Sequence, residues 1–215
     1  MHRVIGKRVV DVAPAEFAAL RAAHEEVLLD VGTGDGKHVV HVARRRPDAL
    51  VVGLDASADA MRKTSARAAV RPDRGGLANA LFLRGAAERL PEGLVGVSEV
   101  HVLMPWGSLL RGVVGGDQAM LTTIGAACRP GATFLVALNL HAWRPPVPEV
   151  GGSTEPDPES ALRDLAPLYA AAGWTLDAAA YLDDAGIAAL ATSWTKRLGS
   201  SRDQLDVLAL TGRIG

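Results

Sequence analysis

The sequence predicts an α/β domain of the doubly wound type. Short apolar segments typical of buried strands alternate with helical segments along most of the 215 residues. A turn with three glycines joins the first buried strand to the helix after it, which is how a doubly wound fold opens. Hydrophobic residues make up 48% of the chain, which is enough for the core of one domain. We therefore expect residues 1–215 to form a single domain.

The N-terminal segment, residues 1–12, is predicted to form a hairpin, because two short β segments flank Gly6-Lys7. A helix is expected over residues 14–25, where Pro14 occupies a first-turn position at which a missing N–H costs nothing. The alternating part that follows is predicted to contain strands at 27–29, 50–55, 81–83, 100–103 and 133–140, and helices at 37–45, 58–70 and 117–128.

The last third of the chain begins with a segment of a different kind. Residues 141–160 contain five prolines and two glycines without an apolar period, so we expect a long loop between the fifth and sixth strands. A helix at 162–172, a strand at 174–181 and a final strand at 204–211 follow. Trp174, at the start of the sixth strand, is expected in the core.

Charge and composition narrow the functional classes. A protein that holds nucleic acid only through phosphates is usually basic, so at a net charge of −1 such binding must use local patches. No apolar run reaches membrane-spanning length and no secretory leader opens the chain, so we expect a cytoplasmic protein that binds no membrane. The lone Cys128 excludes an internal disulfide and a cysteine-based zinc site, and we expect a buried thiol there. No metal cluster is apparent, and His38 and His41 are expected at the surface or in packing.

The glycine turn lies between Asp30 and Lys37 and has the pattern acidic-x-G-x-G-x-G. Glycines allow a sharp turn and a close approach of the backbone to a ligand. A dinucleotide fingerprint would place its third glycine at position 37, whereas the third glycine here is Gly36. The spacing therefore departs from the dinucleotide-binding one, and a tight turn without a ligand is the alternative.

An acid also ends the second buried strand, because Asp55 follows Leu54 at its tip. In nucleotide-binding βαβ units an acid at this place takes the ribose hydroxyls. The alternative role is an N-terminal helix cap, which Ser57 fits better. We therefore expect Asp55 to bind a ribose.

A basic stretch lies in and after the helix at 58–70. Its cations are spaced so that a continued helix would place four on one face: Lys63, Arg67, Arg71 and Arg74. In a protein of nearly neutral charge, this local excess favours a surface for phosphates. A solvated helix face is the alternative.

The fourth strand runs into Met104-Pro105-Trp106-Gly107-Ser108. In doubly wound folds the ends of the central strands line the site, and a tryptophan held there by a proline is well placed to stack on a flat substrate. When these two residues are considered by themselves, the alternative is that Trp106 and Trp194 are core residues.

The pattern from Asp30 to Gly36 resembles motif I of the S-adenosylmethionine-dependent methyltransferases. The order of elements suits their seven-stranded, Rossmann-like class I sheet, whose last strand is antiparallel. A methyl acceptor with a free lone pair needs orientation more than acid–base catalysis, so the lack of a catalytic triad is no objection. Enzymes that methylate the exocyclic amine of adenine carry (Asp/Asn)-Pro-Pro-aromatic after the fourth strand. The segment Leu103-Met104-Pro105-Trp106 lacks the polar first residue, which argues for a ring nitrogen as the acceptor.

A closer resemblance covers essentially the whole chain. It is carried by four segments: Gly32-Thr33-Gly34-Asp35-Gly36-Lys37, Met104-Pro105-Trp106-Gly107-Ser108-Leu109-Leu110, Leu138-Asn139-Leu140-His141-Ala142-Trp143-Arg144-Pro145 and Thr192-Ser193-Trp194-Thr195-Lys196-Arg197-Leu198. These segments are similar to the aminoglycoside-resistance 16S rRNA (adenine(1408)-N1)-methyltransferases of the kanamycin–apramycin branch. The resemblance implies methyl transfer from S-adenosylmethionine to N1 of adenosine 1408 in the decoding site of the assembled 30S subunit. It further implies drug resistance, and we expect the enzyme to be a monomer.

The resemblance also implies roles for individual residues. The flipped adenine would lie between Trp106 and Trp194, beside Pro105 and Ser193, because a flipped base needs aromatic faces to replace its lost stacking. The residues expected to bind S-adenosylmethionine are Asp30, Gly32, Gly34, Gly36, Lys37, Asp55, Ala87, Glu88, Leu103, Met104, Trp106, Ser108, Thr192 and Ser193. The residues expected to contact rRNA are Lys63, Arg67, Arg71, Arg197 and Arg202.

Two other functions stay open at this point. One is a small-molecule methyltransferase in which the 141–160 loop forms a lid over the substrate. The other is a non-catalytic RNA-binding protein that kept the fold. Methyl transfer to ribosomal subunits rather than to metabolites would exclude the small-molecule methyltransferase. Binding of S-adenosylmethionine would argue against the non-catalytic protein, whose site should not bind the cofactor.

Overall fold

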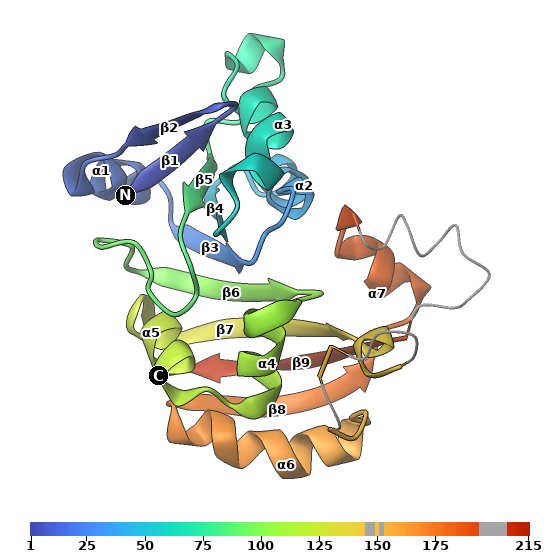
Figure 1. Cartoon of the computed structure of the whole chain (residues 1–215). Coiled ribbons are helices and arrows are strands. Elements are labelled where there is room, and N and C mark those ends of the chain that lie inside the picture. The colour runs from blue at the N-terminus through green and yellow to red at the C-terminus, as the bar shows by residue number, and fades with distance from the viewer. Residues whose placement is uncertain (145–148, 151–152, 194–205) are drawn as a thin grey trace.

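The computed structural model describes residues 1–144, 149–150, 153–193 and 206–215. Its centre is a nine-stranded sheet with the order β2-β1-β5-β4-β3-β6-β7-β9-β8 (Figure 1). The strands are β1 (His2–Ile5), β2 (Arg8–Asp11), β3 (Glu26–Val31), β4 (Ala49–Asp55), β5 (Ala80–Arg84), β6 (Val97–Leu103), β7 (Cys128–Asn139), β8 (Trp174–Tyr181) and β9 (Val207–Ile214). The α-helices are α1 (Pro14–Ala22), α2 (Lys37–Arg45), α3 (Ala58–Ala68), α4 (Gly107–Gly115), α5 (Gln118–Ala126), α6 (Pro158–Ala171) and α7 (Asp184–Ala189).

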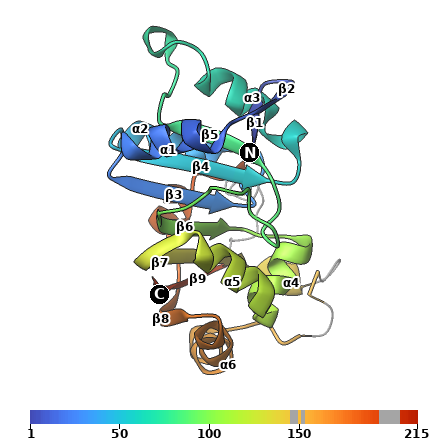
Figure 2. The ribbon, with the colours of Figure 1, turned by 90° about the vertical axis from the view of Figure 1, so that its left-hand side faces the viewer.

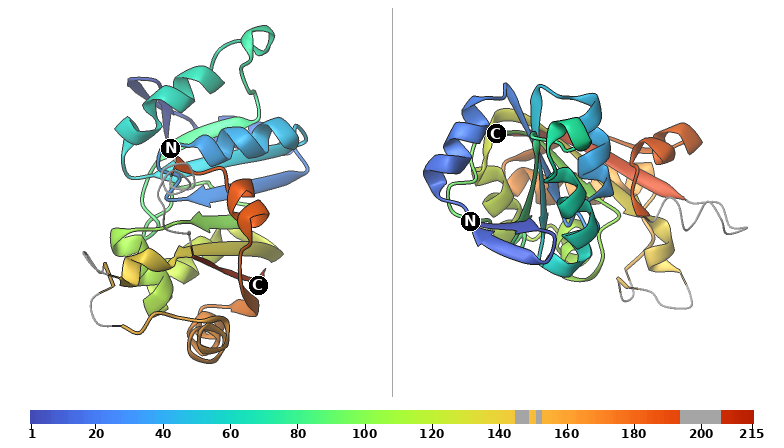
Figure 3. Two further views of the ribbon diagram at one scale, coloured as in Figure 1. Left: turned by 90° about the vertical axis from the view of Figure 1, so that its right-hand side faces the viewer. Right: turned by 90° about the horizontal axis from the view of Figure 1, so that it is seen from above.

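Helices cover both faces of this sheet. One face carries α2 and α3, which pack against an apolar cluster that includes Leu28 and Val51. The other face carries α4, α5 and α6, and its cluster includes Leu29 together with Phe17 of α1. Seen from above, α1 lies on one side of the strands and α2 and α3 lie on the other (Figure 3, right). Because β3 is buried on both faces, its residues Val27, Leu28 and Leu29 form a continuous apolar run rather than an alternating one.

The sheet reverses its strand order at β3. The chain passes from β3 to β4 and β5 on one side and then crosses to β6 on the other side of β3. Figure 2 shows β4, β3, β6 and β7 next to one another in that order. In open α/β sheets, ligands bind at such a switch point, beyond the carboxyl ends of the strands. The glycine turn follows β3 and therefore lies where a ligand is expected.

The expected count of seven strands is wrong, because the N-terminal hairpin extends the sheet. The hairpin forms around Gly6-Lys7 as predicted. Its first strand then pairs antiparallel with β5, with His2 opposite Arg84 and Arg3 opposite Leu83. The last strand, β9, runs antiparallel to both β7 and β8, as the sequence predicts.

Several predicted bounds also differ from the observed ones. The helix expected over 58–70 ends at Ala68, and Arg71 instead leads into the 3-10 helix η1 (Pro72–Arg74). The helix expected from residue 162 begins at Pro158, because Asp157 and Ser160 form a capping box. The loop expected over 141–160 is correspondingly shorter, with the 3-10 helix η2 (Leu140–Trp143) at its start. The short helices α4 and α7 were not predicted.

Trp174 confirms its expected core position. Its side chain is 1% exposed, and its ring centroid lies 4.8 Å from that of Phe134. Cys128 lies at the start of β7, where its thiol donates to the carbonyl of Ile124 at 3.3 Å. Burial raises the pKa of this thiol to about 12, so it is a packing residue rather than a nucleophile.

No helix in the described part of the chain combines the length and apolar character that a membrane span requires. Among the same residues, no group of three or more histidine, cysteine or acidic side chains is arranged to hold a metal ion.

Candidate functional site

Two adjoining cavities lie beyond the carboxyl ends of the central strands. The smaller has a volume of about 210 Å³ and the larger of about 360 Å³. Both are lined by Gly32, Gly34 and Met104, so the glycine turn and the end of β6 lie between them. The cavities therefore form one continuous site at the switch point of the sheet.

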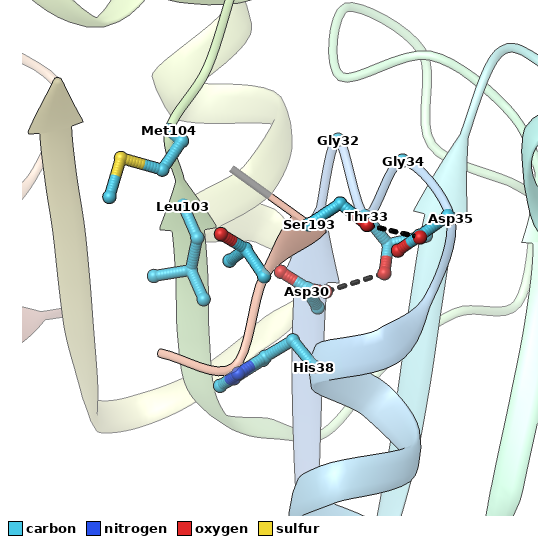
Figure 4. A pocket seen from close by; sticks show the side chains of 10 residues that line it. Asp30, Gly32, Thr33, Gly34, Asp35, His38, Leu103, Met104 and Ser193 are labelled. Atoms are coloured by element: carbon cyan, nitrogen blue, oxygen red, sulfur yellow. Dashed lines mark hydrogen bonds between the residues drawn. The ribbon is translucent and has the colours of Figure 1, made fainter. Parts of the chain in front are cut away.

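The smaller cavity has an acidic floor. Asp30, the fifth residue of β3, is 1% exposed, and its carboxylate accepts a hydrogen bond from Thr33 Oγ1 at 2.5 Å. The side chains of Asp30, Thr33 and Ser193 gather around the glycine turn (Figure 4). A buried carboxylate favours a positively charged ligand group. The complete lining consists of Asp30, Gly32, Thr33, Gly34, Asp35, His38, Leu103, Met104, Thr192 and Ser193.

The three glycines of the turn have different tasks, although all have left-handed backbones with φ of 72°, 58° and 72°. A Cβ added to Gly32 would lie 2.5 Å from Leu109 Cδ2, and one added to Gly36 would lie 2.4 Å from Phe82 Cε1. A Cβ at Gly34 would meet nothing within 4 Å, although Gly34 lines both cavities. Gly32 and Gly36 thus pack against the protein, and Gly34 borders open space that fits a ligand.

Asp55 lies in the wall of the larger cavity, at the end of β4. Its two carboxylate oxygens accept backbone hydrogen bonds from Gly34 and from Ser57, both at 2.8 Å. Ser57, not Asp55, caps α3 by accepting from Ala60 N, which agrees with the sequence-based assignment. A carboxylate has about four acceptor positions, so Asp55 keeps capacity for ribose hydroxyls.

The rest of the larger cavity combines backbone and aromatic groups. Ala87 and Glu88, which follow β5, line one side. Pro105, Trp106 and Ser108 line the side formed by the end of β6 and the start of α4. Trp106 is half-buried and packs against the edge of the core. It therefore contacts the core and lines the cavity at the same time.

Met104 joins the two cavities in an unusual conformation. Its φ of 50° is in the left-handed region, which non-glycine residues rarely adopt. A hydrogen bond from Met104 N to Ala137 O, 2.8 Å long, holds this conformation. Such strain clusters at ligand sites, where the surrounding structure maintains it.

The second wall of the smaller cavity comes from the distant segment Leu190–Ser193. Ala191 has a left-handed backbone with φ of 50°, and Thr192 and Ser193 after it line the cavity. Ser193 Oγ donates to the Asp35 carboxylate and accepts from Lys37 Nζ. Lys37 also forms an ion pair with Asp35 at 2.7 Å. Partial burial opposes ionisation of Asp35, but hydrogen bonds from Lys37 and Ser193 outweigh it and keep the pKa of Asp35 below its usual value.

Most of the residues predicted to bind cofactor therefore come together, with two exceptions. Gly36 and Lys37 line neither cavity: Gly36 packs on Phe82, and the amine of Lys37 is directed to Asp35 and Ser193. Sequence reasoning missed Asp35, His38, Gly85 and Leu109, which line the site. Asp35 and His38 are of types common in functional sites, but no spacing in the sequence indicated a role for either. Gly85 and Leu109 had only their positions, after a strand end and after Ser108, as a signal.

The predicted basic surface is only partly present. Lys63 and Arg67 are exposed on α3. The continued helix that would place four cations on one face does not form, because α3 ends before Arg71, which pairs with Asp73 at 3.6 Å. Trp194, which is predicted to stack on the base, and Arg197 and Arg202, which are predicted to contact rRNA, lie outside the described residues.

The hairpin adds basic residues beside α3. Gly6 N donates to Ser65 Oγ at 3.0 Å, which fixes the hairpin turn against the helix. Figure 3 (left) shows the hairpin next to α3. Lys7 and Arg8, which follow Gly6 in the hairpin, are exposed.

Comparison with known proteins gives a consistent result. The family model described as NpmA: 16S rRNA (adenine(1408)-N(1))-methyltransferase matches residues 2–213. A 16S rRNA (adenine(1408)-N(1))-methyltransferase of Streptoalloteichus tenebrarius is 61% identical over 214 residues, which cover 100% of this chain and 99% of that protein. The crystal structure of the 16S rRNA methyltransferase KamB is 60% identical, covers 100% of both chains and superposes with a TM-score of 0.95.

A more distant structure carries a ligand. It is a mutant 16S rRNA (adenine(1408)-N(1))-methyltransferase from Catenulisporales acidiphilia with the cosubstrate SAM. It is 36% identical with a TM-score of 0.90, and the match covers 100% of this chain and 97% of that one. Together with the glycine turn and the two adjoining cavities, these matches show that the chain belongs to the family of 16S rRNA (adenine(1408)-N(1))-methyltransferases.

Proposed function

We propose that this protein transfers a methyl group from S-adenosylmethionine to N1 of adenine 1408 in 16S rRNA and thereby gives aminoglycoside resistance. The single observation that carries this proposal is the continuous site at the switch point of the sheet. Its acidic cavity and its aromatic-edged cavity meet at Gly32, Gly34 and Met104. The family membership of the whole chain supports the same conclusion.

The residues present fit S-adenosylmethionine. Asp30 would attract the cationic methionine end, and Gly34 leaves room because no atom lies within 4 Å of its Cβ position. Asp55 would hold the ribose hydroxyls, and Ala87 and Glu88 would border the adenine. When bound, the cofactor supplies an electrophilic methyl group on a sulfonium. Gly36 and Lys37 would contribute indirectly. Gly36 packs against Phe82, and Lys37 donates a hydrogen bond to Ser193 in the cavity wall.

The acceptor side needs orientation rather than a general base. N1 of adenine carries a free lone pair, so no proton has to be removed before it accepts the methyl group. Trp106, with Pro105 before it, offers an aromatic face at the edge of the larger cavity. We expect Trp106 and Trp194 to hold the flipped adenine between them, with Ser193 beside it. The methylated ring is cationic, which aromatic faces stabilise by cation–π attraction.

Docking would use the basic residues around α3. Lys63 and Arg67 are exposed there, and the hairpin contributes Lys7 and Arg8. This local excess compensates for a net charge of −1, because phosphate contacts depend on local charge. Arg71, Arg197 and Arg202 are expected to extend the contact. We expect a cytoplasmic monomer whose substrate is the assembled 30S subunit.

The test compares assembled 30S subunits, naked 16S rRNA and small nucleosides as acceptors of labelled methyl groups. We expect incorporation into subunits alone, with a primer-extension stop at nucleotide 1408. Resistance of an expressing bacterium to kanamycin and apramycin should accompany it. Incorporation into nucleosides would instead identify a small-molecule methyltransferase, and cofactor binding without incorporation would identify a non-catalytic RNA-binding protein.

A further inference from the structure

Two buried histidines adjoin the smaller cavity: His38 is part of its lining, and His101 is hydrogen-bonded to His38. Neither has a part in the proposed methyl transfer. His38 is in the first turn of α2, and His101 is in β6, opposite Asp30 of β3. They are 5% and 8% exposed, respectively. His38 Nε2 and His101 Nδ1 are 2.8 Å apart, which is hydrogen-bond distance.

Each ring has a second partner that only accepts hydrogen bonds. His38 Nδ1 lies 2.7 Å from the carbonyl oxygen of Leu190. His101 Nε2 lies 2.8 Å from Glu99 Oε1, and the other oxygen of Glu99 accepts from Arg46 at 2.5 Å. Arg46 also contacts Glu26, so the hydrogen-bonded chain ends at partly exposed charges.

Counting protons along this chain gives its charge. His38 must carry a proton on Nδ1, because a carbonyl oxygen cannot donate. His101 must carry one on Nε2, because Glu99 is ionised: the hydrogen bond with His101 and the charge of Arg46 lower the pKa of Glu99 to about 2. The bond between the rings needs one further proton. Two neutral imidazoles carry two protons, so the observed contacts require a third and hence one positive charge.

The charged and titratable groups around the pair lie on several elements. Glu99 contacts His101 directly, with Arg46 and Glu26 beyond it. Burial lowers the pKa of His38, and repulsion from His101 acts in the same direction, although Asp30 on β3 opposes both. His41, one turn further along α2, has a lowered pKa as well, because of partial burial and the charge of Arg45.

His38 holds the segment that forms the second wall of the cavity. Leu190 caps α7 and is buried beside Leu103 and Met104. The next residue, Ala191, has the left-handed φ of 50°, and Thr192 and Ser193 follow in the cavity wall. Figure 4 shows His38 directed from the start of α2 toward this segment. The unusual backbone at Ala191 therefore follows immediately after the carbonyl that His38 fixes.

We propose that His38 and His101 are positioning residues for the cofactor cavity: they share one excess proton and, through Leu190, hold the Thr192–Ser193 wall in place. The role of this wall toward cofactor rests on the proposed function, whereas the shared proton does not. When the excess proton is lost at higher pH, two ring protons remain for three hydrogen bonds. One bond must then open, and the wall becomes less ordered.

The shared proton is tested on the unmodified protein by nitrogen NMR of the histidine rings. We expect three protonated nitrogens among the four at pH 7. As pH rises, loss of the third proton should coincide with faster amide hydrogen exchange at residues 191–193. Two neutral rings at pH 7 would overturn the proposal, whether or not the protein methylates rRNA.

Two substitutions at His38 separate its hydrogen bonds. Asn places its amide near the position of Nδ1 and keeps a donor for Leu190, whereas Gln reaches the position of Nε2 and loses that donor. We expect His38→Asn to keep the dissociation constant of S-adenosylmethionine within about twofold and His38→Gln to raise it about tenfold. Amide exchange at 191–193 should accelerate only in His38→Gln, and the control His41→Gln should change neither measurement.

Equal behaviour of the Asn and Gln variants would overturn the role of the Leu190 contact. Failure of the proposed function gives a different pattern, in which the unmodified protein binds no S-adenosylmethionine while the exchange rates still follow the Asn–Gln difference.

Discussion

The two walls of the smaller cavity are built in different ways. The glycine-turn wall is held by its backbone: Gly32 N and Thr33 N donate to Leu54 O at 2.8 and 3.0 Å. The second wall, Thr192–Ser193, is held by side chains, through His38 to Leu190 and through Asp35 and Lys37 to Ser193. The first wall continues directly from β3 and is bonded to β4, whereas the second is attached by side chains.

This difference predicts different responses to change. A wall fixed by backbone bonds between strands opens only when the sheet itself unfolds. A wall fixed by a few ionisable side chains can open locally, with little effect on the free energy of unfolding. Substitutions in the first wall should therefore affect stability, and those in the second should affect ligand binding.

The largest expected effect comes from Gly36→Ala, behind the first wall. Its left-handed backbone and a Cβ 2.4 Å from the buried Phe82 ring leave no room for a methyl group. We expect the free energy of unfolding to fall by about 3 kcal/mol in chemical denaturation. In the control, Gly34→Ala, the Cβ meets nothing within 4 Å, so only backbone strain of about 1–2 kcal/mol is expected, with weaker cofactor binding. Equal losses of stability would contradict the assignment.

Trp106→Ala tests a residue that belongs to neither wall. We expect methyl transfer to 30S subunits to fall about 100-fold, which is about 2.7 kcal/mol, because the acceptor base loses a stacking partner. The affinity for S-adenosylmethionine, measured by calorimetry, should largely survive. As a matched control, Trp174→Ala should lower the free energy of unfolding by about 3–5 kcal/mol, since Trp174 is fully buried. A comparable loss of stability in Trp106→Ala would make it a core residue instead.

Ser193→Ala should loosen the second wall while the fold stays intact. It removes the hydroxyl that contacts both Asp35 and Lys37. We expect the dissociation constant of S-adenosylmethionine to rise about tenfold and the free energy of unfolding to change by less than about 0.5 kcal/mol. Thr123→Ala, which removes an exposed hydroxyl bonded to Ala119 O, is the control and should change neither quantity. A large loss of stability in Ser193→Ala would place this wall in the cooperative core.

The pH dependence of the Asp35 contact is smaller and has a defined sign. The pKa of Asp35 is lowered in the folded protein, so its contribution is complete above about pH 4, the usual value for a carboxyl. It is lost only as the pH falls through the lower folded-state pKa. The ratio of cofactor dissociation constants between Asp35→Asn and the unmodified protein should therefore stay constant from about pH 5 to 8. A ratio that changes within this range would show that another group titrates with the contact.

The smallest expected effect concerns the basic surface, far from both walls. Reversal of Lys63 and Arg67 to Glu should weaken binding to 30S subunits about fivefold at low salt and less at high salt. Cofactor affinity should not change. Arg163→Glu on α6 is the control, because Arg163 is exposed and already pairs with Asp164 at 2.8 Å. Unchanged subunit binding would identify Lys63 and Arg67 as ordinary solvated residues.

Much of the fold could be predicted from the sequence, because the buried central strands are apolar runs and their helices have clear start and stop signals. The hairpin was also predictable, but its pairing with β5 was not, since edge pairing depends on tertiary contacts such as Gly6 to Ser65. The helix α4 was missed because it contains Gly107, Gly112 and Gly115.

The two walls of the site also differ in how far the sequence could predict them. Asp30, Gly32, Gly34 and Asp55 lie in or beside one βαβ unit, so spacing alone brings them together. The contacts of Asp35 and His38 with Ser193 and Leu190 join residues more than 150 positions apart. No local pattern indicates such a contact, and a histidine on a helix gives no sign that it is buried.

The position of β9 has a consequence for synthesis. Strand β9 is inserted between β7 and β8, so β8 has no neighbour in the sheet until β9 has been synthesised. A nascent chain that lacks β9 would leave β8 and the helix α6 packed on it without support. We expect these two elements to reach their final packing only after β9 has left the ribosomal tunnel.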